Sequence, residues 1–360
     1  MNEVKVFSGL LLALLAGAYV SWTKSPEGRS TETKVELFAG TKDAIEELRL
    51  VSSTATVTVS FKKDDDGTRY PWFTYAAGKV TRGFTANKSF DERLASFAPF
   101  MAVRSLGVLS PSELKSVGLS GKGERKFTLT TRNQTKVFEV GGRTHGARDH
   151  YVRPEGRAEV YIVEARVLGD LEFPDGHFMQ RRLVEASEET SEKVTVADSQ
   201  GQMKTLVRRS DDSPAGGFWA LESSPDTPNE TWGNYLDKLV KLSASEYLGD
   251  AASFETQYRP ILEARWFNKD GKVTGSVTLA KAGEGKTANY AAMSMATRVP
   301  VKVARFTAEQ LEHDLGSVLT DAETPATTPP TAPNSPKDPR SPKTTKNPKT
   351  RKGPEKKNIP

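Results

Sequence analysis

The chain has 360 residues, of which 36% are hydrophobic and 27% are charged, so it can bury one large core or two modest ones. It contains no cysteine, which excludes a disulfide framework, a thiolate metal site and a cysteine nucleophile. The formal net charge is +5, but residues 334–360 hold nine Lys and Arg against two acids, which leaves about −2 for the first 333 residues. Because that basic segment has no aromatic residue to stack on a base, we expect no nucleic-acid partner.

An uncharged apolar stretch, Val6–Trp22, lies near the N-terminus between Lys5 and Lys24. Its leucines favour insertion into lipid, and its length is at the short end of a membrane span. Alternatively, the small residues around Ala16 and Ala18 fit a cleaved signal peptide. Under either interpretation, residues 6–22 contact the membrane and the rest of the chain is exported. The flanking charges barely favour either orientation. Together with the family resemblance described below, the signal-like stretch predicts an inner-membrane, single-pass location, with the bulk of the chain periplasmic or otherwise extracytoplasmic.

The C-terminal segment, Thr324–Pro360, consists mainly of Pro, Thr, Lys and Asn. It has too few apolar side chains to offset the entropy of ordering, so we expect an extended, disordered tail. Its positive charge predicts either a solvated spacer or a contact with an anionic envelope polymer, which salt would weaken. We therefore divide the chain into a membrane anchor or signal peptide (1–24), a linker (25–42), a first α+β repeat (43–187), a second α+β repeat (188–322) and the tail (323–360).

In the first repeat, alternating apolar residues and turn signals predict a run of strands. A helix is expected to end at Gly107, because Leu94, Phe97, Met101 and Leu106 recur near helical spacing. A short helix is expected near Leu171. The predicted strands are 44–49, 56–62, 70–73, 125–131, 136–140, 150–153 and 159–164.

In the second repeat the same order of elements is expected. A helix is predicted over 231–248, ended by Gly249, and another over 308–319. Asn268-Lys269-Asp270-Gly271 is a strong hairpin signal between two strands. The predicted strands are 194–197, 203–208, 217–219, 261–267, 273–280, 288–293 and 299–304.

Three landmarks keep nearly one spacing between the halves. Trp72 and Trp219 are 147 residues apart, Gly107 and Gly249 are 142 apart, and the Asp-Leu pairs that begin at Asp170 and Asp314 are 144 apart. The repeated order predicts an α+β protein of two similar halves, each an antiparallel sheet with a helix packed on one face. Both tryptophans are then expected to be core residues.

Several short motifs occur together between Phe90 and Leu183. They are Leu106-Gly107, Ser110, Glu113-Leu114-Lys115, Val117-Gly118-Leu119, Phe138-Glu139-Val140-Gly141, Thr144-His145-Gly146, Arg148-Asp149-His150-Tyr151-Val152-Arg153 and Val160-Tyr161-Ile162-Val163. In this combination the chain resembles the domain-of-unknown-function family 4340. The resemblance implies a bacterial membrane-anchored extracytoplasmic protein, often encoded near ABC-type export permeases associated with gliding motility. It implies no activity.

The most suggestive chemical cluster is the turn from Thr144 to His150. His145, Asp149 and His150 are metal-competent ligands, but their spacing matches no standard motif, and His177 would have to fold back to complete a site. We therefore favour a polar turn and predict no metal site, no cofactor and no catalytic residue. Gly283–Thr287 resembles the end of a phosphate-binding loop but leads into a strand, so we expect a hairpin end. Asp64–Gly67 is expected to be a solvated turn rather than a calcium site.

Three functional hypotheses follow. The first is a non-catalytic accessory or structural component of an envelope transport or motility assembly, which contacts an export permease or other envelope proteins through sheet edges or through a groove between the halves. The second is a binding module for a polymer or small solute in that groove between the halves. The third is a metal-assisted hydrolase at the His145–His150 turn. Because the first is the leading hypothesis, we expect that the protein is not an enzyme.

Overall fold

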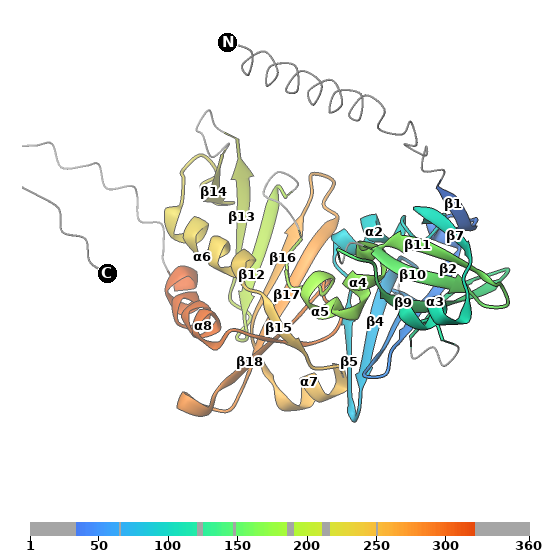
Figure 1. Cartoon of the computed structure of the whole chain (residues 1–360). Helices are drawn as coiled ribbons and strands as arrows, with labels where there is room; N and C mark the ends of the chain where they lie inside the picture. The colour runs from blue at the N-terminus through green and yellow to red at the C-terminus, as the bar shows by residue number, and fades with distance from the viewer. Residues whose placement is uncertain are drawn as a thin grey trace, which may run out of the picture. The chain divides into compact units, whose positions relative to one another are not determined.

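The computed structural model describes residues 34–64, 66–120, 125–146, 149–185, 191–210, 217–249 and 251–320. The predicted anchor at 6–22 and the basic tail lie outside the described residues. Among the helices of the described part, none is both long and apolar enough to cross a membrane. The described part belongs to one compact unit that ends at Thr320, and it is an α+β protein built on two large antiparallel sheets (Figure 1).

The first sheet has nine strands in the order β5-β4-β3-β2-β8-β9-β10-β11-β7. Its strands are β2 (Ile45–Val51), β3 (Thr56–Lys63), β4 (Arg69–Ala77), β5 (Val80–Thr85), β7 (Arg104–Val108), β8 (Lys126–Thr131), β9 (Thr135–Arg143), β10 (Asp149–Pro154) and β11 (Glu159–Glu164). A separate two-stranded sheet pairs β1 (Val35–Phe38) with β6 (Phe100–Ala102).

The core of the first half is rich in phenylalanine. Along β3, the buried Val57 and Val59 alternate with less buried threonines, so one face of the strand points into the core. Phe73 of β4 lies at the centre of an aromatic group. Its ring centroid is 5.1 Å from that of Phe84, 4.8 Å from that of Phe90 and 5.7 Å from that of Phe178. Helices α2 (Lys88–Leu94), α4 (Ala165–Glu172) and α5 (Pro174–His177) lie in this half, together with α3 (Pro111–Ser116) and the 3-10 turn η1 (Lys42–Ala44).

The second sheet has eight strands in the order β14-β13-β12-β16-β17-β18-β19-β15. Its elements are β12 (Lys193–Asp198), β13 (Met203–Arg209), β14 (Phe218–Leu221), α6 (Glu230–Lys241), β15 (Ala244–Tyr247), α7 (Ala251–Gln257), β16 (Arg259–Phe267), β17 (Val273–Ala282), η2 (Gly285–Thr287), β18 (Asn289–Ser294), β19 (Val301–Val303) and α8 (Arg305–Thr320).

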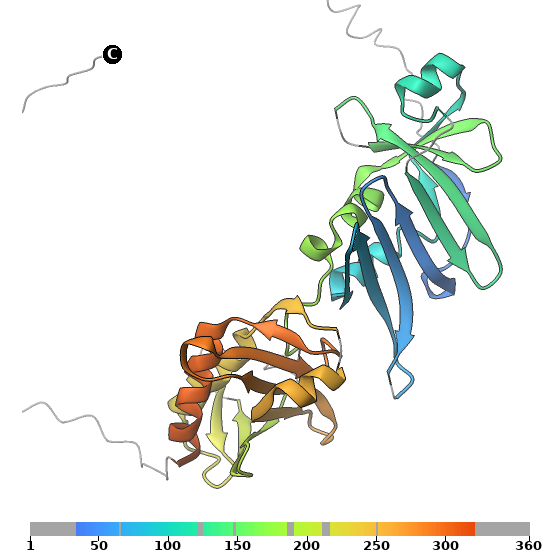
Figure 2. The same ribbon diagram turned by 90° about the horizontal axis from the view of Figure 1, so that it is seen from below.

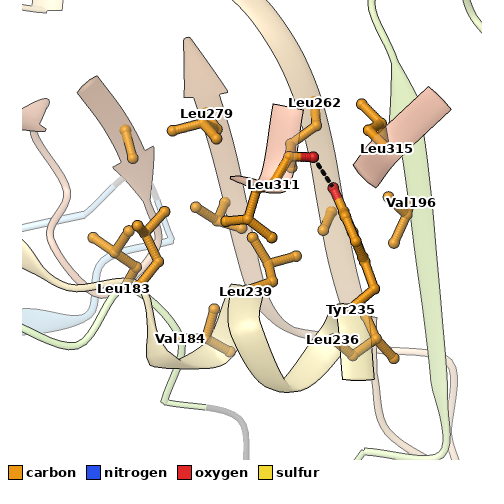
Figure 3. Packing of buried hydrophobic residues seen from close by; sticks show 14 of the residues in the cluster. Leu183, Val184, Val196, Tyr235, Leu236, Leu239, Leu262, Leu279, Leu311 and Leu315 are labelled. Atoms are coloured by element: carbon orange, nitrogen blue, oxygen red, sulfur yellow. Dashed lines mark hydrogen bonds between the residues drawn. The ribbon is translucent and has the colours of Figure 1, made fainter. Parts of the chain in front are cut away.

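The core of the second half lies between this sheet and the helices α6 and α8. In both ribbon views, α8 runs beside the sheet (Figures 1 and 2). Leu239 of α6 and Leu311 of α8 are fully buried with Leu279 of β17 (Figure 3). The hydroxyl of Tyr235 donates to the carbonyl of Leu311 at 3.3 Å, so the one polar atom of this buried ring is satisfied. Burial raises the pKa of Tyr235 above its usual value.

The two sheets share a strand order. Strands β4, β3 and β2 correspond to β14, β13 and β12. The next four strands, β8 to β11, correspond to β16 to β19, and the last strand, β7, corresponds to β15. Only β5 has no counterpart in the second sheet as described. Trp72 and Trp219 fall on the matched strands β4 and β14, and both are buried, as predicted.

Two predicted helices are shorter than expected. The helix that was expected to run as far as Gly107 is α2, which ends at Leu94. Strands β6 and β7 follow it. Pro99 explains the difference, because proline lacks the amide donor that a helix interior needs. The helix expected over 231–248 ends at Lys241, and residues 244–247 form β15, paired with β19. Pairing with a neighbouring strand outweighs the local helical spacing there.

Residues of β5 and β15 are in contact, so an edge of each sheet faces the other. Tyr247 of β15 packs against both cores, and its ring centroid lies 6.4 Å from that of Trp72 and 6.2 Å from that of Phe84. The Thr85 hydroxyl donates to the Thr297 carbonyl at 2.8 Å. Two of the four sheet edges are therefore protected by each other rather than by solvent-exposed charges.

A second link between the halves runs through Arg298. Its Nε lies 2.9 Å from both carboxylate oxygens of Asp64, and its guanidinium lies over the Tyr70 ring at 4.2 Å. Arg298 has a φ of 61°, a conformation that costs about 1 kcal/mol or more for a residue other than glycine. The Asp64–Gly67 turn was predicted to be solvated, but Asp64 forms an ion pair with Arg298.

Candidate binding pocket

A pocket of about 470 Å³ opens in the second half, at the C-terminal end of α6. Its size falls within the range of small-molecule sites, which are mainly apolar with a few well-placed polar groups. The lining residues come from four separate stretches of the chain: Arg182, Val184, Glu185, Ser191, Trp219, Leu236, Asp237, Val240, Lys241, Leu242, Ser243 and Trp266.

Helix α6 supplies one wall. The side chain of Asn229 accepts a hydrogen bond from the Trp232 amide at 3.0 Å and so caps the start of the helix. From this start, the buried Tyr235 and Leu239 face the core, whereas Leu236 and Val240 lie one position further on and line the pocket. Leu236 also belongs to the buried cluster and lies beside Tyr235 (Figure 3), so the pocket borders the core.

Strands supply another part of the lining. Trp219 of β14 and Trp266 of β16 are both buried, and both line the pocket. Just before β12 lies Ser191, which is only 1% exposed and also lines the pocket. Its hydroxyl oxygen has no hydrogen-bond partner in the described part of the chain. A buried hydroxyl without a partner costs free energy, so this atom is a ready partner for a polar group that enters the pocket.

The segment from Arg182 to Glu185 is held in place by Gln180. The buried amide of Gln180 donates to the Arg182 carbonyl and to Glu185 Oε1, both at 2.9 Å. The carbonyl of Gln180 in turn accepts a hydrogen bond from the Tyr247 hydroxyl at 2.9 Å. One side chain and its backbone therefore connect the pocket wall to β15.

Some charged side chains at the pocket already have partners, and one does not. Asp237 pairs with Lys241 at 2.6 Å, and Glu185 already accepts the Gln180 amide. The exposed Arg182, in contrast, forms no ion pair with any described carboxylate. A cation is thus the group best placed to bind an incoming charge.

In the first half, His150 lies on β10 opposite Arg143 of β9 and Val163 of β11. Its side chain is fully buried, and the backbone of Gly141 and Gly142 lies near its ring. Burial above all, with the positive charges of Arg125 and Arg143, lowers the pKa of His150 to about 4. His150 is therefore a neutral core residue at physiological pH.

The other residues of the predicted metal site are more exposed than His150. His145 is exposed at the turn, Asp149 is half-buried at the start of β10, and His177 is exposed at the end of α5. Within the described ranges, no three His, Cys, Asp or Glu side chains form a group that could hold a metal ion. The metal-assisted hydrolase hypothesis therefore has no ligand cluster there to support it.

The loop Gly283–Thr287 joins β17 to β18, as expected for a hairpin end. Its carbonyl groups, not its amides, face a charge, because the Arg305 guanidinium donates to the carbonyls of Gly285 and Lys286. A phosphate-binding loop needs amide groups aimed at the anion. The loop is therefore a cation-capped hairpin.

Sequence comparison places the chain in a family. A family model described as a domain of unknown function, DUF4340, matches residues 81–260. The chain belongs to the DUF4340 family. The family resemblance inferred from the sequence motifs is confirmed. The matched segment extends beyond the region from Phe90 to Leu183 that contains those motifs. No curated protein and no solved structure was found to match the chain. The DUF4340 segment contains every residue that lines the pocket except Trp266.

Proposed function

We propose that this DUF4340 protein is a non-catalytic accessory component of an envelope transport or motility assembly, anchored in the inner membrane by residues 6–22. The charge-free stretch Val6–Trp22 supports the membrane location. The fold supports a docking role, because an antiparallel sheet with an open edge can bind a partner's strand through backbone hydrogen bonds.

The observation that carries the docking role is the edge strand β7. It is the last strand of the nine-stranded sheet and pairs with β11. Val108 at its end is 69% exposed, and Arg104 and Ser105 are exposed as well. An edge strand, which pairs with a neighbour on one side only, is a common site of association with another chain.

The other three edges are less accessible. Strands β5 and β15 face each other, as described above. Strand β14 is bordered by α6, and its Trp219 carbonyl accepts a hydrogen bond from the Asn229 amide at 2.9 Å. Strand β7 is therefore the edge best placed to receive a partner, and we propose a strand of an export permease or another envelope protein as that partner.

Site-specific photo-crosslinking in the native host tests this proposal. A photoreactive residue at Val108 should crosslink to a membrane-assembly protein, whereas the same residue at Met203, 61% exposed in the second half, should give no such product. The Val103 amide donates to Ile162 of β11, so the next amide, that of Arg104, faces the open edge. An Arg104→Pro variant removes this backbone donor and should lower the yield at Val108 several-fold. Equal crosslinking from both positions would contradict docking at β7.

The location is tested separately. An alkaline phosphatase domain fused after Thr320 should be active, because that enzyme needs the extracytoplasmic compartment to fold, and the protein should stay in the membrane after a high-salt wash. An inactive fusion, or full-length protein in the soluble fraction, would show that residues 6–22 do not act as proposed.

We also propose that the two halves arose by duplication. The common strand order and the three sequence offsets of 142 to 147 residues support this origin. Sequence profiles built separately from each half of DUF4340 relatives should then align over the eight common strands. Profiles that align no better than unrelated sheets of the same order would argue for convergence on one topology.

The second candidate function is a binding module for a small solute. The observation that favours it is the pocket beside α6, with its apolar walls and the unpartnered hydroxyl of Ser191.

A further inference from the structure

We infer that the pocket beside α6 binds a small, mainly apolar organic acid, whose apolar body packs on the indole rings and whose carboxylate binds Arg182 and Ser191. This inference deepens the binding-module candidate and is independent of docking at β7, because the two sites are in different halves of the sequence.

The apolar part of the ligand follows from the walls. Trp219, Leu236 and Trp266 are at most 6% exposed yet line a space of about 470 Å³. Filling such a space with apolar atoms restores dispersion contacts that an empty cavity lacks. The volume suits a body of several carbon atoms rather than a polymer.

The charge of the ligand follows from the polar groups. The carboxylates of Asp237 and Glu185 already have donors, Lys241 Nζ and the Gln180 amide. They therefore offer little to a cationic ligand. Arg182 presents a forked set of donors that matches a carboxylate.

Ser191 is the second, independent observation. Its hydroxyl is buried, lines the same pocket and is unsatisfied among the described residues. A carboxylate oxygen that enters the pocket can accept a hydrogen bond from this hydroxyl, which removes the cost of leaving it unpaired. A purely apolar ligand would leave that cost in place.

Isothermal titration of the full-length protein with octanoate, 2-naphthoate and the neutral analogue octanol tests the inference. Octanoate or 2-naphthoate should bind saturably. Arg182→Gln should weaken binding of the acids about tenfold, equal to about 1.4 kcal/mol, and leave the affinity for octanol unchanged. The matched control Arg49→Gln removes an exposed arginine from β2 in the first half and should change neither.

Two further variants distinguish the pocket from non-specific apolar binding. Val240→Trp places a larger side chain at a half-buried position of the lining and should abolish binding of acids and octanol alike. Ser191→Ala should weaken the acids a few-fold, consistent with the loss of one hydrogen bond. Circular dichroism verifies folding of each variant.

The inference is overturned if neither acid binds saturably, or if Arg182→Gln binds octanoate as tightly as the parent protein. It is also overturned if octanoate binds Val240→Trp, when that variant is folded, with parental affinity. None of these outcomes bears on crosslinking at Val108, so this inference and the docking proposal can fail separately.

Discussion

The two halves have the same strand order but different cores. Nine phenylalanines belong to the buried cluster of the first half, whereas the buried cluster of the second half contains none and is built from Leu, Val, Ala, Tyr and Trp. The comparison teaches that this topology depends on the alternation of apolar and polar positions rather than on particular side chains. What differs is how the space beside a helix is filled.

That difference places the pocket. The seven-residue helix α2 seats Phe90 against Phe73, and the aromatic rings fill the space beneath it. The twelve-residue helix α6 faces the core with Tyr235 and Leu239 but leaves room at its C-terminal end, beside Trp219. The phenylalanine rings of the first half therefore fill the space beside α2, whereas a pocket stays open beside α6.

The largest expected effect is the loss of a ring from the filled core. Phe73→Ala should lower the free energy of unfolding by about 3–5 kcal/mol, because Phe73 is fully buried among three other aromatic rings. Val240→Ala, at the pocket wall, should cost less than about 1.5 kcal/mol, because the space beside it is already open. Urea denaturation checks both, and equal losses would contradict the contrast between the cores.

The second-largest expected effect is a loss of stability at low pH, caused by His150. His150 has a folded pKa of about 4, below the value of 6.5 for an exposed histidine, so the unfolded chain takes up a proton that the folded chain excludes. The stability from neutral His150 is complete above pH 6.5 and falls as the pH drops towards 4, by at most about 3 kcal/mol.

Denaturation between pH 7 and pH 4 measures this slope. His150→Phe should flatten it, whereas His313→Gln, which replaces an exposed histidine of α8, should leave it unchanged. If both variants keep the parental slope, the pH dependence arises elsewhere in the chain.

The smallest expected effect concerns the link between the halves. Asp64→Asn removes the charge that holds Arg298 and should cost about 1 kcal/mol, since the pair is only half-buried and screened in part by water. Glu246→Gln breaks the exposed pair with Lys302 and should cost less than about 0.5 kcal/mol. Thermal denaturation at low and high salt compares the two, and a larger loss for Glu246→Gln would reverse the expected ranking.

Most strands were predictable because their apolar residues alternate over long runs, as in Thr56–Lys63 and Val273–Ala282. Strands β7 and β15 were not, because short segments such as Ala244–Tyr247 have no clear period, and partners far away in the chain decide their structure. Local spacing alone therefore gave helices that were too long.

The pocket could not be predicted from local pattern. Its lining combines Arg182, Ser191, Trp219, α6 and Trp266, which lie up to 84 residues apart, and each looks like an ordinary core or surface residue by itself. Trp219 was correctly predicted to be buried, but the sequence does not show that it borders a cavity. The strand repeat was the available signal, because it predicts a helix packed on one face of the second sheet.

The contact between β5 and β15 has a consequence for any attempt to study the halves alone. An isolated second half would leave one side of Tyr247 bare and free the edge of β15, and an isolated first half would do the same to Phe84 and β5. Uncovered strand edges next to apolar rings are prone to self-association. Each half expressed separately would therefore be expected to aggregate, although its own core is intact.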